Sequence, residues 1–351
     1  MDAHVLVSIL SHSVSNVKDI TNLRLVNKFF NKTISDRSSW RHLQPIIVKS
    51  DIDSIIANTD NLYWYHGFLS IRPQVDQLYR LAQLTDYHGQ LIVNLNRTTV
   101  SDVSTLGNVH TLKLKDSSVI DVSALAHVHT LDLAFTKVID VSPLSHIHAL
   151  DLSNTEVTDV SALANVHTLN LSNTKVVDVS ALTHVHTLNL TQSKVVDVSA
   201  LTHVHTLDLS RTKVLDVSAL ANVHTLKLFG SDVVDVSPLI NVHSLDLTLT
   251  KVVDVSALTH VHTLILNGTD VKDVSALTHV HTLDLAGTKV VDVSALGNVH
   301  TLNLSHTKVV DVSALGNVHT LNLSYTKVVD VSALGNVQSL DIGYTEVSEV
   351  E

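Results

Sequence analysis

Apolar and polar positions follow a pattern that returns every nineteen residues over most of the chain. Within one repeat the stretch HTLNLS alternates polar and apolar residues, which predicts a β-strand with Leu188 and Leu190 facing a core. A fixed short period predicts a solenoid with one coil per repeat. In the coil formed by residues 178–196, the regularly apolar positions are Val179, Leu182, Val185, Leu188, Leu190 and Val195.

An aspartate marks the same place in each coil. It recurs thirteen times from Asp102 to Asp330, and Glu349 occupies the fourteenth slot. In the motif DVSAL this carboxylate can accept hydrogen bonds from backbone N–H groups two and three residues later, which predicts a capped helical turn. The alternative is a pair of catalytic carboxylates, but a catalytic site needs one unique constellation. We therefore expect a structural role for this column.

The repeat resembles a known family. The residues that carry the resemblance follow the pattern LxLxxTxVxDVSxL, read at Leu169, Leu171, Thr174, Val176, Asp178, Val179, Ser180 and Leu182. Over residues 91–351 the chain is similar to leucine-rich-repeat proteins, and most similar to their short, internalin-like variants. Thr or Ser replaces the family's usual Asn, as at Thr174 and Ser193, and the coil is shorter than the commoner form. The resemblance implies a solenoid with a parallel β-sheet on one face.

The composition of the chain argues against several classes of function. The formal net charge of −11 argues against general nucleic-acid binding, which needs clustered Lys and Arg. The chain has no cysteine, which excludes a disulfide framework, a thiol nucleophile and a zinc site built on Cys, and which fits a reducing compartment. Neither a secretory signal nor an apolar segment of membrane-spanning length is evident, so we expect no membrane association and a cytoplasmic or nuclear location.

Charge also suggests a domain boundary. Residues 1–90 hold nine Lys or Arg and eight Asp or Glu, whereas residues 91–351 hold fourteen and twenty-six. The repeat starts close to the same point, so the boundary is expected near residue 90.

Two histidine columns run along the repeats. The second His of HVH recurs from His110 to His319, with Gln338 in the last slot, and the first His alternates with Asn, as at His184 and Asn165. Because Asn is a poor metal ligand, this exchange favours a structural or surface role over adventitious binding of nickel or zinc. We expect no physiological metal and no cofactor. Stacked imidazoles would repel one another when charged, so we expect their folded pKa to fall below the ordinary value.

Most outward strand and turn positions carry Thr, Asp, Asn or Ser, but a few carry other residue types. Aromatic and Arg side chains on a surface are favoured contact anchors, so these positions are candidates for binding a protein partner. The alternative is drift among recently duplicated coils. The departures are Lys113, Lys115, Phe135, Arg211, Lys227, Phe229, Leu249, Ile265, His306, Tyr325 and Tyr344.

The repeat is absent from the first ninety residues. Residues 5–43 have the apolar spacing of three short helices. The stretch ILSHSVSNVKDITNLRLVNKFFNKTISDRSSW resembles the F-box motif in its Ile-Leu start, its Leu-x-Leu-Val-Asn-Lys stretch and its terminal Trp, although DAHV stands in place of the family's Leu-Pro opening. F-box helices bind the adaptor Skp1. By resemblance, that interface or its supporting core would comprise Leu6, Ile9, Leu10, Leu23, Val26, Phe29, Phe30 and Trp40.

Together these patterns predict an α+β repeat protein. An all-helical, F-box-like three-helix domain (residues 1–45) precedes a helical connector and N-terminal cap (46–90) and a solenoid of nineteen-residue coils (91–351). In the connector, PQVDQLYRLAQL has helical spacing, with Pro73 at a suitable helix start.

An F-box followed by leucine-rich repeats is the order found in substrate receptors. The resemblance therefore implies a substrate-recognition adaptor of a cullin–RING (SCF-type) ubiquitin ligase, which binds a Skp1-like adaptor and an unidentified target protein. Near-identical, His-rich coils behind an F-box also resemble proteins encoded by giant DNA viruses of amoebae, which would place the protein in a host cell.

Other functions fit less well. A non-ligase interaction scaffold, with F-box-like helices that only cap the solenoid, is the main alternative. A secreted adhesin of internalin type would need a signal segment. An enzyme is the least favoured interpretation, because no Gly-rich phosphate loop or unique catalytic cluster is evident in the sequence.

Overall fold

The computed structural model describes residues 47–50, 68–84 and 90–347. The chain divides into two compact units, residues 1–157 and 158–351, and each is described by itself. The F-box-like segment, including Leu6, Ile9, Leu10, Leu23, Val26, Phe29, Phe30 and Trp40, lies outside the described residues.

The described part of the first unit carries a parallel sheet whose strands follow chain order. Each strand pairs with the next, and from β4 onward the register advances by one coil, as in Thr111↔Thr130 and Thr130↔Ala149. The strands are β1 (Ile47–Ser50), β2 (Phe68–Ile71), β3 (Gln90–Asn94), β4 (Thr111–Lys113), β5 (Thr130–Asp132) and β6 (Ala149–Asp151).

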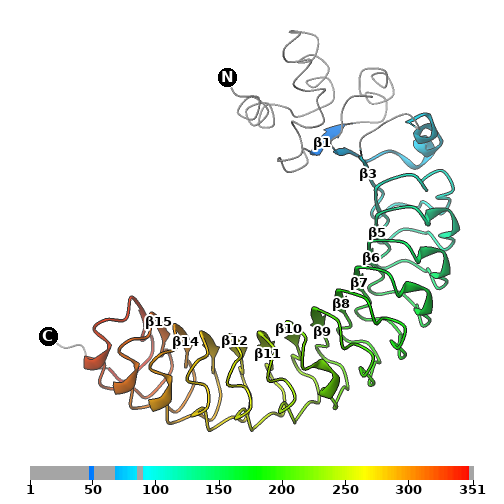
Figure 1. The fold of residues 1–351 in the computed structure, drawn as a ribbon. Helices are drawn as coiled ribbons and strands as arrows, with labels where there is room; N and C mark the ends of the chain where they lie inside the picture. The colour runs from blue at the N-terminus through cyan, green and yellow to red at the C-terminus, as the bar shows by residue number, and fades with distance from the viewer. Residues whose placement is uncertain (1–46, 51–67, 85–89, 348–351) are drawn as a thin grey trace, which may run out of the picture. The chain divides into compact units, whose positions relative to one another are not determined.

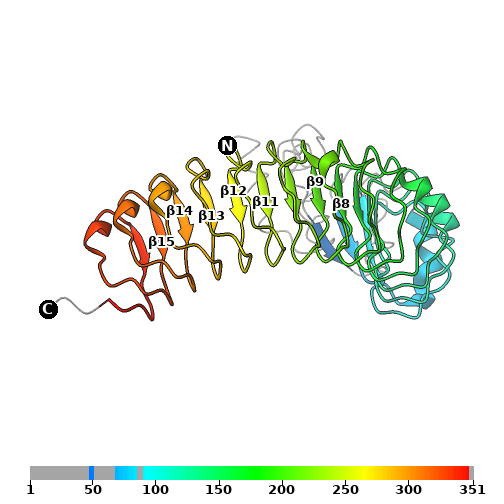
Figure 2. The ribbon, with the colours of Figure 1, turned by 90° about the horizontal axis from the view of Figure 1, so that it is seen from below.

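The described part of the second unit, residues 158–347, continues the same pattern. Its strands also pair in parallel and in chain order, with the same register in each pair, so that Leu188 faces Leu207 across neighbouring strands. The strands are β7 (Thr168–Asn170), β8 (Thr187–Asn189), β9 (Thr206–Asp208), β10 (Thr225–Lys227), β11 (Ser244–Asp246), β12 (Thr263–Ile265), β13 (Thr282–Asp284), β14 (Thr301–Asn303), β15 (Thr320–Asn322) and β16 (Ser339–Asp341). Figure 2 shows successive strands side by side.

Short 3-10 helices or turns lie opposite the strands. Within each unit the strands line one face of the stacked coils and the turns line the other (Figure 1). This arrangement is the parallel-sheet solenoid that the nineteen-residue period predicts. The 3-10 helices of the coils are η3 (Ser123–Leu125), η4 (Ser142–Leu144), η5 (Ser161–Leu163), η6 (Ser218–Leu220), η7 (Ser294–Leu296), η8 (Ser313–Leu315) and η9 (Ser332–Leu334).

The core of each coil is the set of aliphatic positions expected from the sequence. In the coil of residues 178–196 these side chains are at most 2% exposed, and Leu182, Leu190 and Val195 are fully buried. Neighbouring coils place identical side chains above and below. Each coil therefore completes its apolar core only when other coils cover it.

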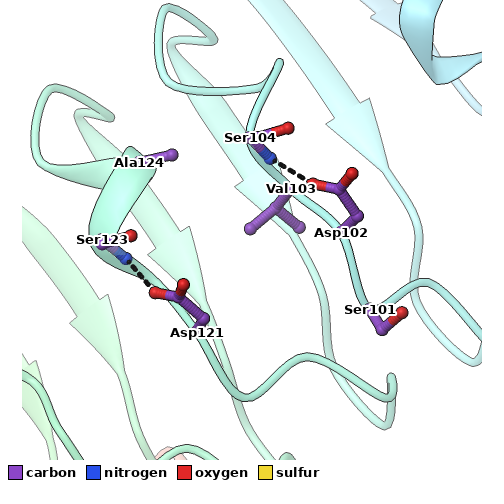
Figure 3. Close-up of a pocket in the computed structure, with 7 residues that line it drawn as sticks. All are labelled: Ser101, Asp102, Val103, Ser104, Asp121, Ser123 and Ala124. Atoms are coloured by element: carbon purple, nitrogen blue, oxygen red, sulfur yellow. Dashed lines mark hydrogen bonds between the residues drawn. The ribbon is translucent and has the colours of Figure 1, made fainter.

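The aspartate column closes the turn opposite the strands, as expected. In Figure 3, Asp102 Oδ1 accepts a hydrogen bond from the Ser104 N–H, and Asp121 Oδ1 accepts one from Ser123, each at 2.9 Å. The same bond recurs at 2.8–2.9 Å in every coil from Asp140 to Asp330. The prediction of a turn-capping role is confirmed for the N–H two residues later.

A second column of buried polar residues stabilises the turn after each strand. Thr174 Oγ1 donates to the carbonyl oxygen of Leu171 at 2.7 Å, and Thr212 repeats this bond to Leu209. Three coils carry Ser at this position, and the buried hydroxyls of Ser117, Ser193 and Ser231 have no hydrogen-bond partner. The β-branched Thr restricts its hydroxyl to few rotamers and adds a methyl group to the core.

Between residues 46 and 90 the structure departs in part from the predicted helical connector. PQVDQLYRLAQL does form a helix, the 3-10 helix η2 (Val75–Leu84), which begins just after Pro73. However, the stretches IVKS and FLSI form β1 and β2, which pair in the sheet ahead of β3. Strands therefore begin before residue 91. Short apolar runs of this length suit a strand as well as a helix, so periodicity alone did not separate them.

The last coil has an exposed core. All three residues of β16 are exposed. Leu340 is 37% exposed, whereas its counterpart Leu321 is 1% exposed.

Replacing Ser193 and Ser231 with Thr should stabilise the chain by about 1 kcal/mol per site, because each change supplies a missing buried hydrogen bond. Urea unfolding measures the effect. The reverse change, Thr174→Ser, is the matched control and should destabilise. A lack of stabilisation by the two Ser→Thr changes, or a lack of destabilisation by Thr174→Ser, would contradict this role of the hydroxyl.

Candidate functional site

A turn with left-handed backbone follows each strand, and it holds most of the departures from the repeat. This position has φ between 55° and 68° in successive coils, including non-glycine residues such as Phe135, Arg211 and Leu249. It carries no Val, Ile or Thr in any coil, because β-branched side chains are strongly disfavoured at positive φ. Its side chains are exposed in most coils, so a coil tolerates wide variation there without disturbing its core.

Five departures form one contiguous group in the second unit, which we call the central patch: Arg211, Lys227, Phe229, Leu249 and Ile265. They come from four successive coils. The Arg211 guanidinium lies over the Phe229 ring, 5.1 Å from its centroid. Leu249 is 57% exposed, and a Cβ atom added to Gly268 would lie 2.6 Å from Leu249 Cδ2, so the glycine makes room for this side chain.

Two members of the central patch lack a local hydrogen bond that the equivalent residues of most other coils make. At their strand position Asp or Asn normally accepts a bond from the N–H two residues later, as Asp208 does from Ser210 and Asp246 from Thr248, each at 2.9 Å. Lys227 and Ile265 cannot accept this bond. Lys227 instead lies in register between Asp208 and Asp246 of the adjoining strands.

The first unit has a smaller group of the same chemistry. Lys115 Nζ lies 5.2 Å from the centroid of the Phe135 ring, and Lys113 is in register with Asp132. The pKa of Asp132 is raised above its ordinary value, chiefly by burial and also by Asp151, while the N–H of Ala134 and the charges of Lys115 and Lys113 oppose the rise. The two lysines thus favour the charged form of this half-buried carboxyl group.

A ladder of aromatic rings occupies the left-handed turn of the last three coils. His306 stacks on Tyr325 at a centroid distance of 4.3 Å, and Tyr325 stacks on Tyr344 at 4.5 Å. Tyr344 is 79% exposed. All the predicted contact residues of the repeats are therefore at least partly exposed, and the structure gathers them into three groups.

The histidine column that precedes the strands forms a regular stack. In the second unit consecutive rings from His167 to His319 lie 4.4–4.7 Å apart. In most coils Nδ1 is hydrogen-bonded to the hydroxyl of the following Thr, as between His205 and Thr206 at 3.3 Å. Burial lowers the pKa of His186 and the adjoining imidazoles lower it further, with the same causes at His262 and His300. The expected downward direction is confirmed at these positions.

Each carboxylate of the aspartate column is hydrogen-bonded within its own turn, as Asp178 is to Ser180 and Asp197 is to Ser199. Hydrogen bonds from the backbone N–H and the hydroxyl of Ser180 lower the pKa of Asp178, and the corresponding serines do so in the neighbouring coils. Shallow hollows between coils are lined by these same Asp–Ser pairs, such as Asp102 with Ser104 (Figure 3). Within the described ranges no three His, Asp or Glu side chains converge as metal ligands.

The structure also reveals an exposed apolar column that the sequence analysis did not single out. It lies one residue before most of the aspartates, as at Val196, which is 51% exposed, and Leu215, which is 61% exposed. The two successive valines of the motif KVVD already indicated this exposed column. Two successive residues of an extended chain point to opposite sides, so one of the two valines has to face outward.

Comparisons with known proteins identify the fold. No family model matches the sequence, and no curated protein matches it either. The internalin inlF from Listeria monocytogenes is 24% identical with a TM-score of 0.61, over 71% of this chain and 85% of that chain. The leucine-rich-repeat domain of APL1 is 14% identical with a TM-score of 0.55, over 78% and 82%. The TLR13–ssRNA13 complex is 14% identical with a TM-score of 0.52, over 84% and 60%.

The fold is therefore that of leucine-rich-repeat proteins, as the repeat pattern indicated. This fold presents an extended face and is suited to protein–protein interaction. Because TLR13 was solved with RNA, the fold lends no support to the expectation that nucleic acid is excluded as a partner. No helix among the described residues is long and apolar enough to span a membrane.

Lowering the pH from about 7.5 to about 5.5 should lower the melting temperature. Where the folded pKa of a histidine lies below its unfolded value of 6.5, its stabilising contribution is complete above 6.5 and is lost as pH falls through the folded value. The aspartates lose their contribution only below 3.8, so the two effects occupy separate pH windows. Differential scanning calorimetry provides the measurement, and equal melting temperatures at the two pH values would contradict the expectation.

Proposed function

We propose that the chain is a non-enzymatic protein-recognition solenoid and that the central patch is its main contact with a target protein. The observation that carries this proposal is the loss of a local hydrogen bond at Lys227 and Ile265, within the same group as Arg211, Phe229 and Leu249. Side chains that break a local structural rule without a gain to the fold are expected at functional sites. The same bond is lost at Lys113, which lies in the smaller group of the first unit, so all three losses fall within groups of departures from the repeat.

The chemistry of the central patch suits a protein partner. It combines an Arg stacked on an aromatic ring, two aliphatic side chains and a lysine, and the Arg and the aromatic ring are types that contribute strongly at protein interfaces. Arg211 and Leu249 lie at left-handed turns that hold their backbone in one conformation. A partner would therefore meet side chains mounted on a fixed framework, which reduces the entropy lost on binding.

The finer proposal concerns the N-terminal segment. We infer from the F-box resemblance of residues 3–43 that this segment binds a Skp1-like adaptor and that the protein is a substrate-recognition adaptor of an SCF-type ubiquitin ligase. The absence of cysteine supports an adaptor role, because the chain cannot carry ubiquitin on a thiol or build a Cys-rich RING. Its effect would come from holding a target near the ligase. Such a role would place it in the cytoplasm or nucleus, of a host cell if the resemblance to giant-virus proteins extends to its origin.

Reverting the central patch to residues that other coils carry should abolish target binding while preserving the fold. The variant is Arg211→Gly, Lys227→Asn, Phe229→Thr, Leu249→Gly and Ile265→Asn. Quantitative affinity purification compares it with wild type, and the specific partner should be recovered at least about tenfold less.

The matched control makes the same kind of reversion away from the strand face, at Leu215→Val, Ile240→Thr and Lys272→Val. It should recover the partner as wild type does. Unchanged recovery with the reverted patch, or equal reductions in both variants, would refute the assignment of the central patch.

Purified Skp1 tests the adaptor proposal separately. The wild-type chain should retain Skp1 in a pull-down, and Leu10→Asp combined with Phe30→Asp should lose it, because two charges would be placed in an apolar interface. The reverted central-patch variant is the control and should keep Skp1. If wild type fails to bind Skp1, the non-ligase scaffold becomes the better interpretation, whatever the result for the central patch.

A further inference from the structure

The histidine stack of the second unit is a regular one-dimensional array of ionisable groups. Consecutive rings are 4.4–4.7 Å apart and within 24° of parallel. The spacing is fixed by the coil repeat, because each ring is anchored one residue before a strand. We call the rings from His167 to His319 the histidine ladder.

Hydrogen bonds orient the rings of the ladder. Nδ1 is paired with a Thr hydroxyl at 3.2–3.4 Å in seven of its coils. Nε2 is on the opposite side of the imidazole from the bond to the chain, so it is the nitrogen placed to meet an external ligand. A Thr hydroxyl can donate or accept, so it can satisfy Nδ1 in the neutral and in the protonated ring.

The surroundings of the ladder are free of permanent charge over a long stretch of each coil. From the serine after the aspartate to the first leucine of the strand, as in residues 199–207, no coil between 178 and 330 contains Asp, Glu, Lys or Arg. The neighbouring column adds four more imidazoles, at His184, His203, His260 and His279. The charged residues that follow on the same strands are Asp208, Lys227, Asp246 and Asp284.

Protonation would therefore create a line of positive charge on an otherwise neutral edge. Neighbouring imidazoles repel one another when charged. A small anion offsets this repulsion at only one or two rings of the histidine ladder. A linear polyanion offsets it along the whole ladder, and its linked charges bind with a high effective concentration after the first contact. Phosphodiester and polyphosphate chains fit this requirement, because they carry a charge every few ångströms and stay ionised in mild acid.

We propose that the histidine ladder is a binding ridge for a linear phosphate polyanion, which it holds in mildly acidic solution and releases at neutral pH. The shared chemistry is a chain of ionised phosphates, whether inorganic polyphosphate or the backbone of a single-stranded nucleic acid. The site is distinct from the central patch, and the proposal does not depend on the proposed function.

Fluorescence anisotropy with labelled polyphosphate and with a labelled single-stranded homopolymer tests the proposal on the full chain. At matched ionic strength, affinity for at least one polymer should be about tenfold or more higher at about pH 5.5 than at about pH 7.5. Binding of polyphosphate alone would identify the inorganic polymer, and binding of both would identify the shared phosphate chain. Failure of both polymers to bind at the lower pH would overturn the proposal.

Two variants separate the ladder from general electrostatics. The ladder variant replaces His205, His224, His243 and His262 with Gln, the residue that the same column carries at Gln338. The control replaces Lys194, Lys213, Lys308 and Lys327 with Gln, which removes as many positive charges elsewhere on the coils. Melting temperatures measured at neutral pH confirm that both variants fold.

At about pH 5.5 the affinity of the ladder variant should be about tenfold or more weaker than that of wild type. The slope of its affinity against salt should fall by about 0.7 for each phosphate that the missing imidazoles no longer neutralise. The control should bind within about twofold of wild type. Equally weakened binding in the two variants, or unchanged binding in the ladder variant, would show that the ladder is not the binding ridge.

Discussion

The structure depends on the cover that each coil gives to its neighbours. A nineteen-residue coil presents buried Leu and Val side chains on both of its open faces, and only a similar coil above and below removes them from water. In the last described coil Leu340 is 37% exposed, while its counterparts in the preceding coils are almost fully buried. This constraint explains why the repeats are so uniform. Each buried side chain also packs against the adjoining coils, so a change in one coil alters the packing of its neighbours.

Stacking also decides which residues can vary. Aspartate closes one turn through its bond to a backbone N–H, and Thr closes another through its bond to a leucine carbonyl, so both recur with little change. The left-handed turn after the strand excludes β-branched residues but places its side chain in solvent, and it therefore accepts Phe, Arg, Leu and Tyr. Within each coil, the residues that maintain the fold are thus different from the residues that vary on the surface. Coils of nearly identical sequence can therefore present different side chains to a partner.

Much of this architecture could be predicted from the sequence. Strand alternation placed Leu188 and Leu190 in the core, and the DVSAL motif indicated the turn that Asp178 closes. The left-handed turn was not predicted, although the absence of β-branched residues there was visible, because variable positions carry little local signal. The exposed column formed by the second valine of KVVD was not predicted, because only the regularly apolar core positions, such as Val195, were assigned an environment. The contacts within the central patch depend on pairing between coils, so the sequence showed its members but not that Arg211 lies over Phe229.

Removal of one complete coil tests the central claim most directly, because the claim concerns coils as interchangeable stacked units. Deletion of residues 178–196 joins two coils of the same register, and urea unfolding of this shortened chain is the measurement. The account predicts a folded protein with a cooperative transition, a lower midpoint and a slope reduced in proportion to the surface that the deleted coil would have buried. An unfolded chain, or a transition identical to that of the intact protein, would contradict the account.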